Sequence, residues 1–310
     1  MRFYYIYKAL AHPEYHGYVT PFTLEERLMQ VKEAQRTLGS RIPWLCDGMS
    51  NDLKHAFGDA SNGEFVIDSS GQVIRRRKWS DPEELRRDLE ELIGPVDPRT
   101  RVGDLHLEAE PPPETVAHGV VPAVRAPGPM HPLRMEPVFR QATVPFYVKL
   151  RAEVDDPFLE TNSGTLYLGF HLDPLYHVHW NNLAAPLEFT LKAPGTVEVI
   201  PGEGRAPKVK EPADADPREF LLKLHAGERD RPLALSVRYF ACDDANTFCV
   251  PVTQEYTIHL QVDPDGGSAP GRRRGSAPRR RRDAGSPPRP VQPSEEPAQT
   301  GHHGGGRLRL

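Results

Sequence analysis

Seven short runs rich in β-branched and aromatic residues fill the second half of the chain, and turn-forming residues separate them. These runs cover residues 144–154, 165–172, 176–180, 187–192, 219–225, 233–241 and 251–262. Short, closely spaced strands with Pro and Gly at their turns are typical of two packed antiparallel sheets. We therefore expect residues 138–263 to form an all-β sandwich.

The first 94 residues alternate strand and helix signals instead. An aromatic run at 2–8 predicts a buried strand. Thr23, with Glu26 three residues later, forms a capping box that opens a helix, and Gly39 ends it. Further signals predict a strand at 42–46, a short helix at 50–57, a hairpin around 69–71 and a helix at 81–92. Apart from its opening, this order of elements is thioredoxin-like.

Two segments carry few apolar residues. Residues 95–137 contain scattered Pro, Gly and His and are expected to form a linker. Residues 264–310 hold ten Arg and four acidic residues, a net charge of +6, so the preceding residues carry −10. Such a tail cannot bury enough surface to offset its chain entropy and is predicted to be disordered. We favour a solvated tail over a nucleic-acid-binding one, and expect at most weak nucleic-acid contacts from the Arg run at 279–282.

Composition excludes several classes of protein. No apolar run reaches about 18 residues, so no membrane span is expected, and the first residues lack the pattern of a signal peptide. Three cysteines are too few for a four-cysteine metal site. His171, His177 and His179 have no fourth ligand at suitable spacing, so we expect no metal and no cofactor.

The first block resembles the bacterial deiodinase-like branch of the thioredoxin superfamily over about 90 residues. The resemblance is carried by the stretches at 5–18, 23–28 and 46–58. The positions that match the family pattern are His12, Glu26, Arg27, Asp47, Met49 and Asn51. The acidic residues that precede Ala-His in the family are replaced here by Lys8, Ala9 and Leu10. The resemblance implies that His12 is a vestigial site residue.

The reactive residue of that branch has no counterpart in this sequence. Relatives carry a reactive cysteine or selenocysteine in an upstream strand–turn–helix, and no Cys-x-x-Cys motif occurs here. We therefore expect an incomplete domain without deiodinase activity, and a missing central strand between the strands at 2–8 and 42–46. The true start would then lie upstream of Met1, which would make an extracytoplasmic or periplasmic location possible; otherwise the chain is the remnant of a truncated redox protein.

The second block resembles the N-terminal periplasmic domain of the transmembrane thiol:disulfide interchange protein, the DsbD family. The stretches at 175–182 and 236–256 carry this resemblance, and it implies an immunoglobulin-like sandwich in which Cys242 and Cys249 are the redox pair. Relatives shield their cysteines with an aromatic cap loop, whereas the matching stretch at 201–209 has no aromatic residue. The pair is therefore expected to be more exposed.

The spacing of the two cysteines admits two chemical interpretations. A hairpin-like loop of six residues can bring their Cα atoms within the roughly 4.4–6.8 Å that a disulfide needs. One thiolate could then attack a partner disulfide while the other resolves the intermediate, with a thioredoxin-like protein as partner. The alternative is a non-catalytic binding module with a permanent disulfide. We expect His177 or His179 to tune the thiols, and Cys46 to pack in a core rather than react.

Overall fold

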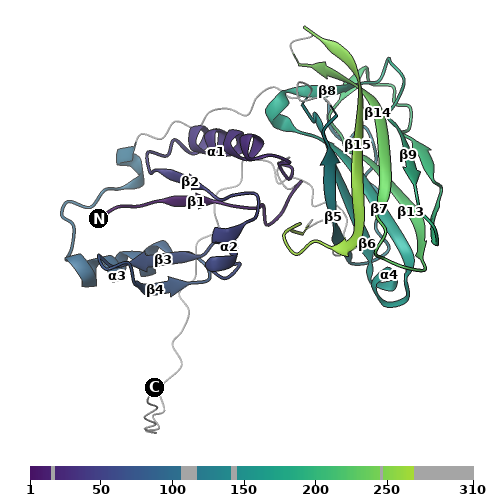
Figure 1. The fold of residues 1–310 in the computed structure, drawn as a ribbon. Coiled ribbons are helices and arrows are strands. Elements are labelled where there is room, and N and C mark those ends of the chain that lie inside the picture. The colour runs from purple at the N-terminus through teal and green to yellow at the C-terminus, as the bar shows by residue number, and fades with distance from the viewer. Residues whose placement is uncertain (15–17, 106–116, 141–144, 245–246, 269–310) are drawn as a thin grey trace, which may run out of the picture. The chain divides into compact units, whose positions relative to one another are not determined.

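The computed structural model describes residues 1–14, 18–105, 117–140, 145–244 and 247–268 (Figure 1). Most of the described secondary structure is strand, and one large antiparallel sheet of 11 strands dominates it. The predicted tail lies outside the described residues, except for its first five positions, 264–268. Most of the segment expected to be a linker is described, apart from 106–116.

The large sheet is built from hairpins and longer antiparallel connections. Its strands are β5 (Met130–Val138), β6 (Val148–Asp155), β7 (Ser163–Leu172), β8 (Val178–Asn181), β9 (Glu188–Lys192), β10 (Val197–Ile200), β11 (Glu203–Arg205), β12 (Ala213–Asp214), β13 (Arg218–Ala226), β14 (Leu233–Asp243) and β15 (Cys249–Val262). The main path runs β10-β13-β7-β6-β5-β15-β14-β8-β12, and β9 pairs with both β14 and β11. A helix, α4 (Asp156–Thr161), connects β6 to β7.

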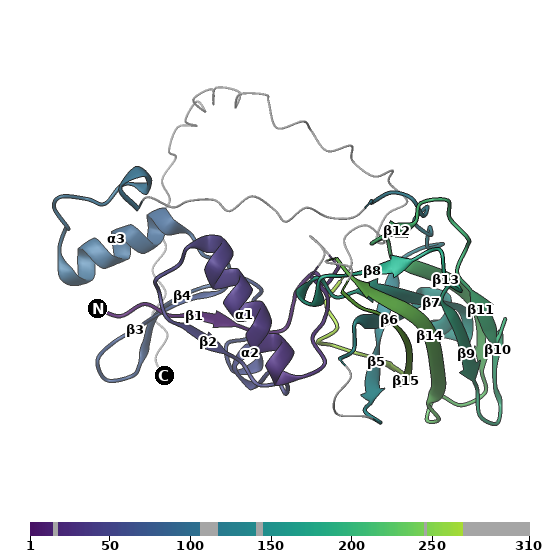
Figure 2. The same cartoon turned by 90° about the horizontal axis from the view of Figure 1, so that it is seen from above.

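The two halves of this sheet face each other across a single apolar core (Figures 1 and 2). Alternate residues of β14, such as Leu235 and Val237, point into the core and are at most 2% exposed. Phe189 of β9 packs against Phe220 of β13, with ring centroids 4.8 Å apart. The hydroxyl of Tyr256 donates to the carbonyl oxygen of Val148 on the opposite half at 2.9 Å. The expected all-β second block is therefore confirmed.

Strand β5 corrects the expected linker at 95–137. It pairs with β15 on one side and with β6 on the other, so it joins the two halves of the sheet. Pro132 and Pro137 lie within β5, and prolines in a sequence argue against a central strand because they lack the N–H that the ladder uses. Pro132 lies where the pairing of β5 passes from β6 to β15, whereas Pro137 lies opposite Tyr256 near the end of the β5–β15 ladder. Leu133, buried at 4% exposure, anchors the strand in the core.

The first block contains a β-α-β unit followed by a hairpin and a helix. The elements are β1 (Tyr5–Tyr7), α1 (Leu24–Leu38), β2 (Trp44–Cys46), α2 (Asp52–Ala56), β3 (Glu64–Ile67), β4 (Val73–Arg77) and α3 (Pro82–Ile93), and a 3-10 helix (Val102–Leu105) follows. The hydroxyl of Thr23 accepts the N–H of Glu26, and Gly39 ends α1 with a φ of 56°. The predicted order of helices and strands in this block and the N-cap at Thr23 are confirmed, but the carboxylate of Glu26 accepts the N–H of Phe22 rather than that of Thr23.

The direct pairing of β1 with β2 corrects the expectation of a missing strand between them. The two strands form a parallel ladder, with Tyr5 opposite Trp44 and Tyr7 opposite Cys46. The backbone groups that would have been left without partners are therefore hydrogen-bonded to each other. The β3–β4 hairpin forms a separate two-stranded sheet.

Several of the motif residues of the first block hold its loops in place. The guanidinium of Arg27, 3% exposed, donates through Nη1 to the backbone oxygens of Asp47 and Gly48 and to Oδ1 of Asn51. The carboxylate of Asp47 accepts the N–H groups of Leu53 and Lys54 at the start of α2. These contacts fix the turn between β2 and α2, which is a structural role for this part of the motif.

Removing the side chain of Thr23 tests its role as the N-cap of α1. We expect Thr23→Ala to lower the free energy of unfolding by about 1 kcal/mol, because the N–H of Glu26 loses its acceptor. Urea unfolding followed by far-UV circular dichroism measures this change. Thr37→Ala, in the exposed last turn of the same helix, is the matched control and should leave stability nearly unchanged. Equal effects of the two substitutions would contradict the capping role.

Candidate functional site

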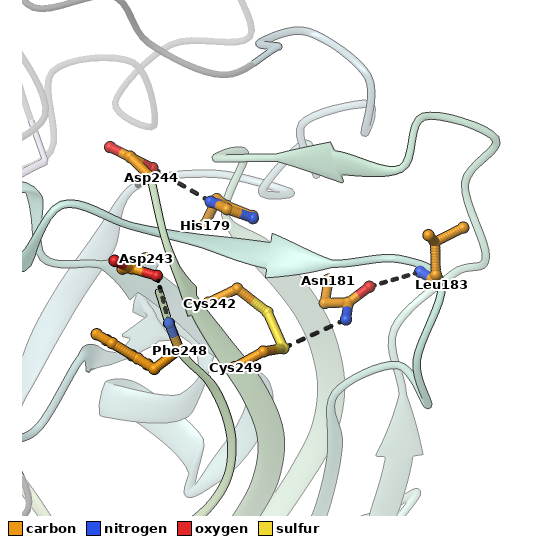
Figure 3. Close-up of a disulfide and its surroundings, with 8 residues drawn as sticks. All are labelled: His179, Asn181, Leu183, Cys242, Asp243, Asp244, Phe248 and Cys249. Atoms are coloured by element: carbon orange, nitrogen blue, oxygen red, sulfur yellow. Dashed lines mark hydrogen bonds and ion pairs between the residues drawn. A yellow bond between two sulfur atoms is a disulfide. The ribbon is translucent and has the colours of Figure 1, made fainter. Parts of the chain in front are cut away.

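A disulfide joins Cys242 to Cys249 at the end of the β14–β15 hairpin (Figure 3). The two residues are directly opposite each other and form the last pair of this antiparallel ladder. Their sulfur atoms are 2.04 Å apart, and their Cα atoms, 4.0 Å apart, are closer than the expected range of roughly 4.4–6.8 Å. The predicted pairing of the two cysteines in a hairpin is therefore confirmed.

The two cysteines differ in their access to solvent. Cys242 is 5% exposed, because it lies on β14 between β8 on one side and β15 on the other. Cys249 begins β15 and is exposed. The expectation of an exposed pair therefore holds for Cys249 and is wrong for Cys242. Part of the stretch at 201–209, where the resemblance led us to expect a cap loop without aromatic residues, forms β11 and pairs with β9.

The loop that closes the disulfide is held by Asp243. Its carboxylate accepts the N–H of Phe248 at 2.8 Å and the hydroxyl of Thr247 at 2.6 Å. These two hydrogen bonds lower the pKa of Asp243 below its usual range, and the one from the N–H of Phe248 has the larger effect. A carboxylate that favours its charged form thus lies next to Cys242 in the sequence.

The structure brings one of the two predicted tuning histidines opposite the cysteine pair. His179 of β8 faces Cys242 in the β8–β14 register, and its Nδ1 lies 3.2 Å from a carboxylate oxygen of Asp244. His177 follows the 3-10 helix Pro174–Tyr176 at a positive φ of 50°, and its backbone oxygen accepts the N–H of Asp244. Within the described part of the chain, neither imidazole is hydrogen-bonded to a sulfur atom. The tuning role of the histidines stays a prediction.

Asn181, at the end of β8, is the site residue that sequence reasoning missed. Its side-chain Nδ2 donates to Sγ of Cys249 at 3.3 Å, and its Oδ1 accepts the N–H of Leu183 at 3.0 Å. The sequence pattern that could have indicated this residue is His-Trp-Asn-Asn at 179–182, where polar residues flank an aromatic one. Only the register of β8 against β14 shows which of the two asparagines reaches the disulfide.

A buried polar network anchors β8 from the inner side of the sheet. Trp180 donates through Nε1 to the backbone oxygen of Asp216 at 2.7 Å, and the guanidinium of Arg218 lies 5.0 Å from the ring centroid of Trp180. Arg218 also pairs with Asp214 at 2.7 Å. Burial alone would raise the pKa of Asp214, but its hydrogen bonds with Arg218 and Asn182 outweigh burial, and the pKa is lowered. This network fixes the strand that carries His179 and Asn181.

The remaining candidates, His12 and Cys46, belong to the first block. His12 is exposed after β1, and its Nδ1 is 3.1 Å from the backbone oxygen of Ser268. Its vestigial role stays a prediction. Cys46 is a free, half-buried thiol in β2, and burial above all raises its pKa, which disfavours the reactive thiolate.

Potential metal ligands come together at one place in the described ranges. His55, Asp59 and Asp265 lie there, and the ammonium group of Lys54 already pairs with Asp265. The three histidines His171, His177 and His179 do not form such a group among the described residues. The Arg run at 279–282 lies outside the described residues.

No helix in the described ranges is long and apolar enough to cross a membrane. No family model, no curated protein and no solved structure matches the chain. Its function therefore has to be argued from the site and from the sequence motifs.

Proposed function

We propose that the protein carries out thiol–disulfide exchange through Cys242 and Cys249. In this proposal the second block is an immunoglobulin-like domain of the thiol:disulfide interchange type, and the first block is a thioredoxin-like scaffold without a Cys-x-x-Cys motif. The sequence motifs around the two cysteines support the first assignment, and the β-α-β unit with its following hairpin supports the second.

The asymmetry of the cysteine pair is the observation that carries the proposal. Cys249 is exposed, whereas Cys242 is buried between two strands. An exchange protein needs one sulfur that a partner thiolate can reach and a second sulfur kept away from stray reagents. A disulfide that only joins two strands has no need of an exposed cysteine.

The exchange proceeds in two substitutions at sulfur. A thiolate of the partner attacks Sγ of Cys249, the bond between Cys249 and Cys242 breaks, and its electron pair leaves with Cys242 as a thiolate, which takes a proton from solvent. A second thiolate of the partner then attacks the partner's own sulfur in the mixed disulfide and releases Cys249. The partner dithiol is oxidised to a disulfide, and the Cys242–Cys249 disulfide is reduced by two electrons.

A thioredoxin-like dithiol protein is the partner that suits this chemistry. Two neighbouring thiols on one protein complete the second substitution without another reagent. The same steps run in reverse when the partner is the oxidised species. A disulfide-forming pair of this kind persists in an oxidising compartment.

A permanent structural disulfide is the second candidate function of the same pair. The disulfide closes the β14–β15 hairpin over a sequence separation of seven residues. Closing so short a loop stabilises a fold by only about 2–3 kcal/mol in the chain-entropy model. Asn182, which follows β8, accepts a part-buried hydrogen bond from Arg218, so the fold near this site does not depend on the disulfide alone.

The reduction potential separates the two candidates. We expect the Cys242–Cys249 couple to equilibrate with glutathione or a thioredoxin-type dithiol at a potential between about −270 and −120 mV. Alkylation of the thiols after equilibration, read by mass spectrometry on the peptide that contains Cys249, measures it. A potential well below about −300 mV would assign the pair to a structural disulfide instead.

A further inference from the structure

We infer that Asn181 stabilises the thiolate of Cys249, so that Cys249 is the more acidic thiol of the reduced pair. This inference rests on the proposed exchange function and names a residue that controls it. It concerns the dithiol form, in which the Cys249 sulfur can carry a full negative charge. A hydrogen bond to a charged sulfur is stronger than one to a neutral disulfide sulfur.

The orientation of the Asn181 amide follows from its second hydrogen bond. The Oδ1 atom accepts the N–H of Leu183, which only an oxygen can do, so Nδ2 is the atom that faces Cys249 (Figure 3). The turn after β8 thus fixes a donor 3.3 Å from Sγ. Asn181 is the last residue of β8, and the pairing of His179 with Cys242 sets the register of β8 against β14 two residues earlier. The Nδ2 donor of Asn181 is therefore in place before any partner binds.

The charged groups near Cys242 and Cys249 explain why the hydrogen-bond donor of Asn181 matters for the thiolate. Asp243 ends β14, Asp244 follows it in the turn, and His179 lies on β8. Asp243 is held as a carboxylate by the loop, and Asp244 faces His179 rather than a sulfur atom. Negative carboxylates near a thiol raise its pKa. In the described ranges, the amide of Asn181 is the one group that donates a hydrogen bond to either sulfur of the pair.

The stabilised thiolate has a consequence for the second step of exchange. Cys249 is the leaving group when the mixed disulfide with the partner is resolved, and a thiol of lower pKa leaves faster. When the direction is reversed, the same thiolate is the nucleophile that attacks an oxidised partner. Asn181 therefore acts on the sulfur that meets the partner, in both directions.

A pH titration of Cys249 in the full chain tests this inference. In a Cys242→Ala background, the rate of iodoacetamide alkylation against pH, read on the peptide that contains Cys249, gives the pKa of this thiol. We expect Asn181→Ala to raise that pKa by about one unit, a tenfold change in the thiolate equilibrium. Asn181→Asp, which keeps the acceptor for the N–H of Leu183 but replaces the donor with a negative charge, should raise it further.

The Asp variant separates a thiolate-stabilising role from a role in the turn alone. A turn role would leave the pKa unchanged in Asn181→Asp, and that outcome would overturn the inference, as would an unchanged pKa in Asn181→Ala. Leu183→Ala, whose side chain is 81% exposed, is the matched control and should match the Cys242→Ala parent. The titration needs no redox partner, so a failed exchange assay would overturn the proposed function without deciding this result.

Discussion

Cys249→Ser is expected to reduce exchange with a thioredoxin-type dithiol to the background rate. A serine hydroxyl cannot form a bond to the partner's sulfur, and the remaining thiol at Cys242 is only 5% exposed. Cys242→Ser should behave differently, because Cys249 can still form the mixed disulfide but nothing within the pair can reform the disulfide. Non-reducing electrophoresis and intact mass measurement after mixing with an oxidised partner distinguish the two variants.

Cys46→Ser is the control for these two variants. Its thiol is half-buried in β2, and its pKa is raised by burial, so the substitution should leave exchange unchanged. A covalent complex that forms equally well in Cys249→Ser and Cys242→Ser would contradict the assignment of Cys249 as the sulfur that meets the partner.

Arg218→Met is expected to cost about 3–5 kcal/mol of folding free energy, the largest stability effect predicted for this protein. The substitution leaves the carboxylate of Asp214, which is fully buried, without its ion-pair partner. It also removes the guanidinium that packs over Trp180 and donates to Asn182. Urea unfolding monitored by tryptophan fluorescence measures the change.

Two further variants make this prediction specific. Arg238→Met removes an exposed arginine that pairs with Glu188 on the outer face of the sheet, and should change stability by no more than about 0.5 kcal/mol. The double substitution Arg218→Met with Asp214→Asn should recover part of the loss, because the unpaired buried charge is gone. Similar losses in Arg218→Met and Arg238→Met would show that burial of the pair is not what matters.

Local signals predicted the elements well where a single physical cause fixes them. The N-cap at Thr23, the turn at Gly39 and the seven β-rich runs each depend on neighbours in the sequence. Strand β5 was missed because its prolines are unfavourable locally, and its partners, β6 and β15, are supplied by distant parts of the chain. The direct pairing of β1 with β2 was also missed, because a pairing between strands that are distant in the sequence leaves no local pattern.

Patterns of neighbouring residues were enough to predict an all-β second block, alternating helices and strands in the first, and Cys242 and Cys249 in one hairpin. The burial of Cys242, the exposure of Cys249 and the contact of Asn181 rather than Asn182 with the sulfur could be seen only in the folded protein. The reason is that exposure and hydrogen-bond partners at this site depend on the register of β8 against β14. A shift of that register by one residue would turn Asn181 to the opposite face of the sheet.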